Sequence, residues 1–262
     1  MTIRKLARAV GSKLRSLIKG RQVEIREDDV FLVSYPRSGN TWVRFLLANV
    51  IDHETEQAID FHSVHSLIPD YGMREHHEYM KTLATPRIMK SHSTFDPRFQ
   101  RVIYLVRDGR DVMVSYYDYE TKHRRFSGSF QDFLLSSRLP YGFWADHVQS
   151  WLNAREERDL LVVRYEDLLQ GTELELDRMT RFAGLKCAPD VLERAVRLSA
   201  FDQMQKLEET RGRPYGDTSY RFVRRGTAGQ WHSKFDEESK AIFKSQANSL
   251  LLELGYVDSP DW

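Results

Sequence analysis

The chain has 262 residues, of which 41% are hydrophobic and 29% charged, and its formal net charge is +1. This composition excludes a mainly disordered chain, because enough apolar surface is available to offset chain entropy. The single cysteine, Cys187, excludes an internal disulfide framework and any zinc site built on two thiolates. No apolar run approaches the ~18 residues that a membrane-spanning helix needs.

The first 22 residues are strongly basic. They contain seven lysines and arginines and no acid, whereas the rest of the chain has 32 basic and 38 acidic residues. Apolar residues recur there at spacings of three and four, which favours an amphipathic helix that could lie on an anionic membrane or dock on the folded domain. We expect residues 1–22 to form an arm and residues 23–262 a single domain. The acidic balance of that domain argues against a nucleic-acid partner.

Short apolar runs and longer helical segments alternate along the domain. The predicted strands are residues 30–34, 87–92, 101–107 and 160–165. The predicted helices are residues 41–51, 109–123 and 236–254, with further helical segments between residues 166 and 198. This alternation predicts an α/β fold, in which helices cover both faces of a central parallel sheet.

The connection after the first predicted strand has the layout of a phosphate cradle. Residues 35–41, YPRSGNT, link that strand to a helix. Gly39 lets the backbone turn its N–H groups inward, and the helix start adds unpaired donors. The lysine-containing GxxxxGK[ST] signature is absent, so an ordinary strand–turn–helix connection remains the alternative.

Two further segments could bind anions. Arg107 ends the third predicted strand, and Ser115 lies two helical turns further on, where an arginine and a hydroxyl could share one phosphate. Arg224 and Arg225 precede Gly226, which could let a loop wrap an anion. The alternative for each segment is a solvated basic surface.

Taken together, these segments resemble the cytosolic-type sulfotransferases, which use 3′-phosphoadenosine 5′-phosphosulfate (PAPS). The similar segments, in the order of the family, are 35–42 (YPRSGNTW, family YPKSGTTW), 90–92 (KSH, family KTH), 107–115 (RDGRDVMVS, the 3′-phosphate motif), 165–167 (YED) and 224–231 (RRGTAGQW, family RKGxxGDW). The resemblance implies a three-layer α/β sandwich of the P-loop-like type. It also implies transfer of a sulfuryl group from PAPS to a hydroxyl or amine, which leaves 3′,5′-ADP (PAP).

The resemblance also implies how the donor is bound. The loop after the first strand would hold the 5′-phosphosulfate, Arg107 and Ser115 the 3′-phosphate, and Trp42 and Phe201 would sandwich the adenine. The implied donor-binding residues are Arg37, Ser38, Gly39, Asn40, Thr41, Trp42, Arg107, Ser115, Tyr165, Ser199, Phe201, Arg224, Arg225 and Gly226.

Three residues would carry the chemistry. His92 would take the proton from the acceptor hydroxyl, and Lys90 would sit over the transferring oxygens. Arg37 replaces the usual loop lysine; it can stabilise charge on the departing phosphate but, unlike lysine, cannot readily donate a proton. We expect no metal requirement, because arginines and a lysine meet the donor's charge.

The acceptor is less defined. We expect it between residues 52–85, 116–144 and 202–221, whose aromatic residues suit a small-molecule or lipid alcohol. The histidines of residues 52–85 look like solvated loop residues rather than metal ligands. We expect a cytoplasmic protein, with peripheral membrane contact through residues 1–22 and the oligomeric state left open. The alternatives are a P-loop NTPase or nucleotide kinase, and a non-catalytic relative that binds PAP.

Overall fold

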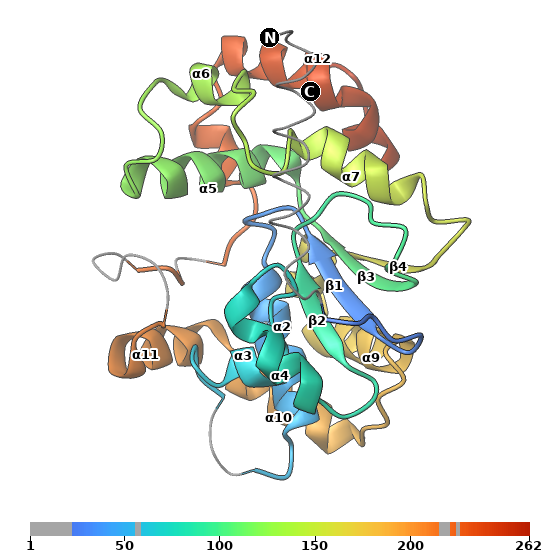
Figure 1. Cartoon of the computed structure of the whole chain (residues 1–262). Coiled ribbons are helices and arrows are strands. Elements are labelled where there is room, and N and C mark those ends of the chain that lie inside the picture. The colour runs from blue at the N-terminus through green and yellow to red at the C-terminus, as the bar shows by residue number, and fades with distance from the viewer. Residues whose placement is uncertain (1–22, 56–58, 215–220, 224–225) are drawn as a thin grey trace, which may run out of the picture.

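The computed structural model describes residues 23–55, 59–214, 221–223 and 226–262. Its centre is a parallel sheet of four strands in the order β2–β1–β3–β4 (Figure 1). The strands are β1 (Val30–Ser34), β2 (Ile88–Ser91), β3 (Arg101–Val106) and β4 (Asp159–Arg164). Each predicted strand is therefore confirmed, with its bounds shifted by at most one residue.

Successive side chains of the central strands enter opposite cores, as the two-residue period of a strand requires. Phe31 and Val33 of β1 belong to one apolar cluster, and Val30 and Leu32 belong to the other. All four are fully buried, which explains why the strand is apolar throughout rather than alternating.

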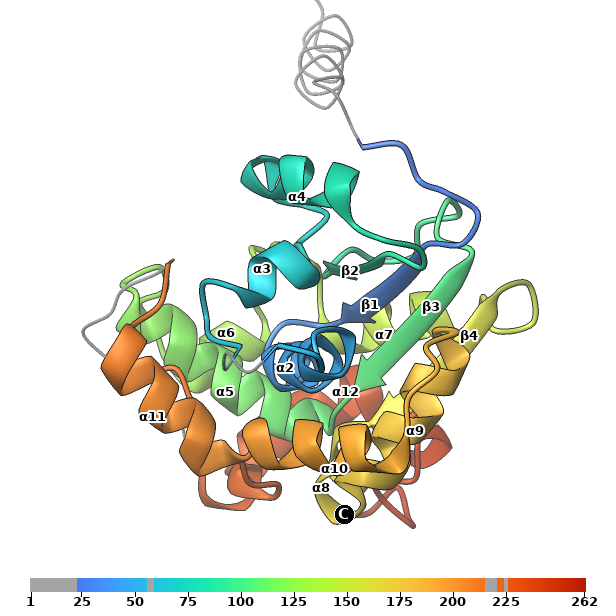
Figure 2. The same ribbon diagram turned by 90° about the horizontal axis from the view of Figure 1, so that it is seen from below.

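Helices cover both faces of the sheet. Figure 1 shows α5, α6, α7 and α12 above the sheet and α2, α9 and α10 below it. Figure 2, the view from below, shows α10 and α11 following one another along that side. The helices are α2 (Asn40–Ile51), α3 (Val64–Leu67), η1 (Arg74–His76), α4 (His77–Thr82), α5 (Gly109–Lys122), α6 (Phe130–Leu134), α7 (Trp144–Leu152), α8 (Tyr165–Gln170), α9 (Thr172–Phe182), α10 (Pro189–Leu198), α11 (Phe201–Arg211), η2 (Gln230–Ser233) and α12 (Glu237–Glu253). The predicted three-layer α/β architecture is confirmed.

The expectation that residues 52–85 form a loop is wrong, and so is that of a solvated His76, whereas His62 is exposed as expected. This segment contains α3, η1 and α4. Its backbone also pairs with β2, because Tyr71 N–H donates to Lys90 O at 2.8 Å and Lys90 N–H donates to Pro69 O at 2.8 Å. The pairing buries His76 completely, and the His76 ring accepts the Asp70 N–H at 2.9 Å. The histidine is thus a packed residue that satisfies a backbone donor.

The predicted basic arm, residues 1–22, lies outside the described residues, so the division of the chain at residue 22 stays a prediction. Within the part that the structure describes, no helix combines the length and the apolar character that crossing a membrane requires.

Candidate active site

The predicted site residues lie where parallel strands end. The loop at residues 35–39 follows β1, His92 follows β2, Arg107 follows β3 and Tyr165 follows β4. Because the strands are parallel, their carboxyl ends meet at one edge of the sheet, which is the usual place for a ligand site in an open α/β fold. Four segments that are far apart in the sequence are thereby brought together.

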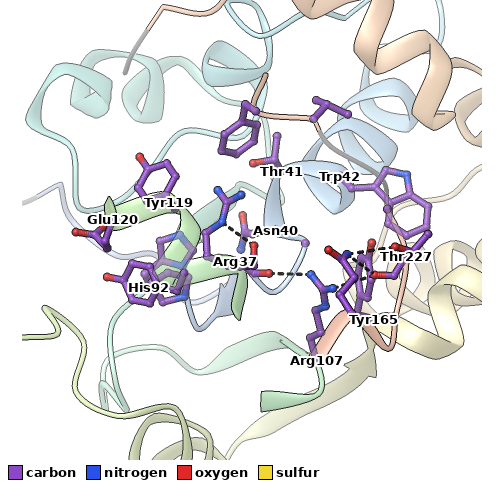
Figure 3. A pocket seen from close by; sticks show the side chains of 18 of the residues that line it. Arg37, Asn40, Thr41, Trp42, His92, Arg107, Tyr119, Glu120, Tyr165 and Thr227 are labelled. Atoms are coloured by element: carbon purple, nitrogen blue, oxygen red, sulfur yellow. Dashed lines mark hydrogen bonds between the residues drawn. The ribbon is translucent and has the colours of Figure 1, made fainter. Parts of the chain in front are cut away.

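These segments line a cavity of about 530 Å³ (Figure 3). The predicted residues that line it are Arg37, Gly39, Asn40, Thr41, Trp42, His92, Arg107, Ser115, Tyr165, Phe201 and Gly226. In Figure 3, Trp42, Tyr165 and Thr227 lie at one end and His92, Tyr119 and Glu120 at the other, with Arg37 and Asn40 between them. The cavity therefore runs from the predicted adenine slot, past the phosphate cradle, to the predicted base.

The cradle is built by two left-handed backbone positions. Arg37 has φ 70° and Gly39 has φ 99°, and residues that alternate in this way turn successive N–H groups toward one point. A Cβ at Gly39 would lie 2.6 Å from Cδ2 of Tyr165, so only glycine fits. The first turn of α2 has neither an acidic residue nor a side-chain cap; Trp42 and Val43 N–H donate back to Gly39 O, so the earlier N–H groups of the turn are the ones available to an anion.

The Arg37 side chain is held over the cavity by aromatic rings. Its guanidinium carbon lies 4.8 Å from the ring centroid of Tyr119 and 4.8 Å from that of Phe222. Its Nε donates to Ser115 Oγ at 3.3 Å. Arginine stacks on aromatic faces better than lysine does, so these rings suit an arginine at this position.

Arg107 connects the cradle to the last loop of the site. Its guanidinium donates to Arg37 O at 3.3 Å and to Thr227 O at 3.0 Å, and it lies over the Tyr165 ring at 4.6 Å. Ser115, its predicted partner, lines the same cavity. Both residues of the predicted 3′-phosphate site therefore line one cavity, although the Ser115 hydroxyl accepts from Arg37 and not from Arg107. Arg224 and Arg225, which were also assigned to donor binding, lie outside the described residues.

The predicted adenine slot has a fixed wall. Trp42 Nε1 donates to Ser199 O at 3.1 Å, and the Trp42 ring packs edge-on against Tyr165 with centroids 5.8 Å apart. Phe201, which is 36% exposed, lines the cavity as well. Ser199 does not line the cavity: it is fully buried, and its Oγ accepts from Asn49 Nδ2 at 3.2 Å. Ser199 orients Trp42 and is not placed to contact a nucleotide.

His92 is fixed in one tautomer. Its Nδ1 lies 2.7 Å from Ser34 O, and a carbonyl oxygen can only accept, so Nδ1 carries the proton. The Nε2 atom therefore has the lone pair. Burial, reinforced by the charge of Lys90, lowers the pKa of His92 from its ordinary 6.5 to about 3, so the ring is neutral at neutral pH. An anion bound beside the ring would raise this pKa again.

Contrary to the expectation, Lys90 does not lie over the cavity. Its Nζ contacts Asp70 Oδ2 at 2.5 Å, and Lys90 is not among the lining residues. Burial opposes ionisation of Asp70, but the Lys90 ammonium, together with His92 and the Gly72 N–H, lowers the pKa of that carboxyl. Lys90 is drawn away from the cavity by Asp70, because the backbone at Asp70 pairs with β2 next to Lys90.

Three buried polar atoms around the cavity have no hydrogen-bond partner among the described residues. They are Ser38 Oγ, Asn40 Oδ1 and Arg107 Nε. Ser38, which belongs to the loop, is fully buried and does not line the cavity. Buried polar groups are normally paired, so such a cluster beside a cationic cradle fits a site shaped for a polar, anionic ligand.

Sequence reasoning missed one structural residue, whereas the acceptor end of the cavity lies largely within the expected segment 116–144. Asp111 accepts the N–H groups of Gly229 and Trp231 at 2.7 and 2.9 Å, and so ties the last loop to α5. Asp111 also lies 3.4 Å from the Arg107 guanidinium, but Arg107 precedes α5, so no helical spacing signalled either contact. The lining residues Tyr116, Tyr119, Glu120, Arg125, Pro140 and Tyr141 lie in the expected acceptor segment 116–144, and Met204 lies in 202–221. The lining residues that were neither assigned to the donor nor part of an expected acceptor segment are Pro36, Leu169, Phe222, Val223, Thr227 and Gln230.

Comparisons with known proteins agree with this geometry. Residues 27–254 match the family described as the sulfotransferase domain. The chain is 29% identical to sulfotransferase 1B1 of Mus musculus, with 86% of this chain and 84% of that protein covered. It is 25% identical to 3-beta-hydroxysteroid sulfotransferase of Cavia porcellus, with 80% and 79% covered. The crystal structure of mouse sulfotransferase SULT7A1 complexed with PAP is similar, with a TM-score of 0.68, 25% identity, and 87% of this chain and 86% of that chain covered.

Proposed function

Because this chain belongs to the sulfotransferase domain family, and its activity is therefore PAPS-dependent sulfuryl transfer, we propose that it sulfates the hydroxyl of a small-molecule acceptor with His92 as the general base. One observation carries the proposal: the phosphate cradle, Arg107 and His92 line one continuous cavity. A nucleotide-bound sulfate and a hydroxyl could therefore meet beside His92.

The donor side of the proposal rests on charge and shape. The N–H groups at the start of α2 and the Arg37 guanidinium would bind the 5′-phosphosulfate, and Arg107 with Ser115 would bind the 3′-phosphate. The Trp42 wall and Phe201 would enclose the adenine, where stacking is typically worth ~1–3 kcal/mol per base. The similar mouse structure contains PAP, which supports the same nucleotide here.

The chemical step would use the tautomer that Ser34 imposes. The lone pair on His92 Nε2 would accept the proton of the attacking hydroxyl, while Nδ1 keeps its hydrogen bond to Ser34 O. The bridging oxygen of the departing phosphate gains charge, which Arg37 would stabilise without giving up a proton. Lys90 would act through Asp70 and the electrostatics around His92, not by touching the transferring group.

The acceptor would enter at the His92 end. Tyr119, Tyr141 and Pro140 line that part of the cavity, and none of the described residues of 52–85 does. A small alcohol or phenol fits this lining. The Cavia porcellus relative is named for a hydroxysteroid, which is consistent with a small-molecule hydroxyl as the acceptor class.

Replacement of His92 tests the proposed base. We expect His92→Ala to lower kcat for sulfation of simple phenols with labelled PAPS by about 100-fold or more, because a general base commonly contributes 10²–10⁴-fold. The variant should still bind PAP by calorimetry, since Nε2 does not contact the nucleotide in the proposal.

The matched control is His53→Ala, which removes an exposed histidine that does not line the cavity. It should retain normal turnover. If His92→Ala binds PAP and turns over within a few-fold of the unchanged protein, His92 is not the base.

A further inference from the structure

One carboxylate faces the cavity at the His92 end. Among the described residues, Glu120 is the single acidic residue in the cavity lining. The arginines of that lining are Arg37, Arg107 and Arg125. Glu120 lies on the last turns of α5, and Figure 3 shows it on the His92 side of Arg37, away from Trp42. An acid in a cavity that must also receive an anionic donor opposes that binding, so its presence calls for a reason.

The surroundings of Glu120 connect it to the proposed base. Tyr116 lies four residues before Glu120 on α5, so the two share one face of the helix, and both line the cavity together with Tyr141. The Tyr141 ring in turn packs against the His92 ring, with centroids 5.6 Å apart. Glu120 therefore belongs to the group of residues that would surround an acceptor hydroxyl at His92.

Glu120 is poorly paired within the described part of the chain. Its side chain is 14% exposed, and its one ion-pair contact there is Arg125 at 3.7 Å, with no hydrogen bond to its carboxylate. The Arg125 side chain is 55% exposed, so water screens this contact. A neutral acceptor entering the cavity would displace water from the carboxylate and return no charge-assisted hydrogen bond.

On these grounds we propose that Glu120 selects acceptors that carry a protonated amine together with the hydroxyl, as amino alcohols and aminoalkyl phenols do. This proposal rests on the proposed function and names its substrate class. The ammonium would bind the Glu120 carboxylate through a charge-assisted hydrogen bond. Glu120 is thus a specificity-determining residue.

The proposal also fixes which atom is sulfated. A protonated amine has no lone pair, so it cannot attack sulfur. The hydroxyl oxygen forms the new S–O bond, its proton passes to His92 Nε2, and the S–O bond to the 5′-phosphate breaks with its electron pair on the phosphate oxygen. The ammonium keeps its proton throughout, and O-sulfation is the expected outcome.

Three phenols of matched size test the charge preference. Tyramine carries a cation, 4-propylphenol is neutral, and 3-(4-hydroxyphenyl)propanoate carries an anion on the same chain length. With labelled PAPS, we expect kcat/KM for tyramine to exceed that for 4-propylphenol by about tenfold or more, as one charge-assisted hydrogen bond typically supplies. The propanoate should be the poorest acceptor.

Glu120→Gln should reduce the ratio of kcat/KM for tyramine to that for 4-propylphenol by about tenfold. The control is Glu237→Gln, because the Glu237 side chain is 91% exposed on α12 and does not line the cavity. It should leave the ratio unchanged. Binding of PAP by each variant, measured by calorimetry, shows that the fold and the donor site are intact.

Two groups of results separate this proposal from the proposed function. A wild-type protein that binds PAP but prefers the neutral phenol, that sulfates none of the three phenols, or whose ratio survives Glu120→Gln overturns the role of Glu120. A protein that binds no PAP overturns the proposed function itself.

Discussion

Arg37 shows how one residue can change the chemistry of a phosphate-binding loop that otherwise resembles the family loop. In the family that the loop resembles, lysine is usual at this position, whereas here an arginine lies between the rings of Tyr119 and Phe222. Its backbone is also left-handed, with φ 70°. The guanidinium is therefore pre-ordered over the cavity, and it offers charge stabilisation rather than a transferable proton.

Arg37→Lys should raise KM for PAPS by about tenfold, because lysine loses the ring contacts and the hydrogen bond to Ser115. The change in kcat should be smaller, since the positive charge remains. Arg37→Ala should lower kcat by about 100-fold or more. Steady-state kinetics with varied PAPS measure both effects, and an unchanged KM in Arg37→Lys would show that the stacked geometry contributes nothing.

At this scale the sequence was informative where a motif combines a strand end with a helix start. His92, Arg107 and most of the cradle at residues 35–41 were predicted and line the cavity; Tyr35 and Ser38 of that loop do not. Lys90 was not placed correctly, because its position depends on Asp70, twenty residues earlier. A contact between distant residues leaves no mark in a local pattern.

At the scale of elements, the loop after residue 225 depends on α5. Both carboxylate oxygens of Asp111 are used, one by Gly229 N–H and one by Trp231 N–H. Trp231 also packs against Arg110, whose guanidinium carbon is 4.0 Å from its ring centroid. The same loop accepts from Arg107 through Thr227 O, so α5 positions the loop that closes the nucleotide end of the cavity.

Asp111→Asn should weaken both the fold and the site. An amide has one acceptor oxygen, so one of the two backbone N–H groups would lose its partner, at a typical cost of about 1–3 kcal/mol. Urea unfolding should show that loss, and calorimetry should show PAP binding weakened by about tenfold. Asp159→Asn, at a half-exposed ion pair on β4, is the matched control and should change neither. A folded Asp111→Asn with unchanged PAP affinity would contradict this role of the loop.

The strands were predictable because burial on both faces leaves continuous apolar runs, such as residues 30–34. The helices α2, α5 and α12 were predicted as well, whereas α6, α7 and α11 were not. The short elements α3, η1 and α4 were missed, since helices of three to six residues show less than two turns of any period. They are fixed by packing beside β2 rather than by local preference.

At the scale of the whole molecule, one cavity spans the carboxyl edge of the sheet. Its nucleotide end is formed by α2, Tyr165 and the loop at Gly226, and its other end by His92 and the last turns of α5. The parallel topology places these segments together, which no single motif reveals. The order along the cavity, from stacking wall through cationic cradle to base, is what sulfuryl transfer from a nucleotide donor requires.

The most direct test of this account is the affinity of the protein for PAP compared with that for ADP, measured by titration calorimetry at one salt concentration. The two ligands differ by the 3′-phosphate, which Arg107 and Ser115 would bind. Charge-assisted hydrogen bonds to that group predict a Kd for PAP about 100-fold below that for ADP. Equal affinities, or tighter binding of ADP, would contradict the assignment of the cavity.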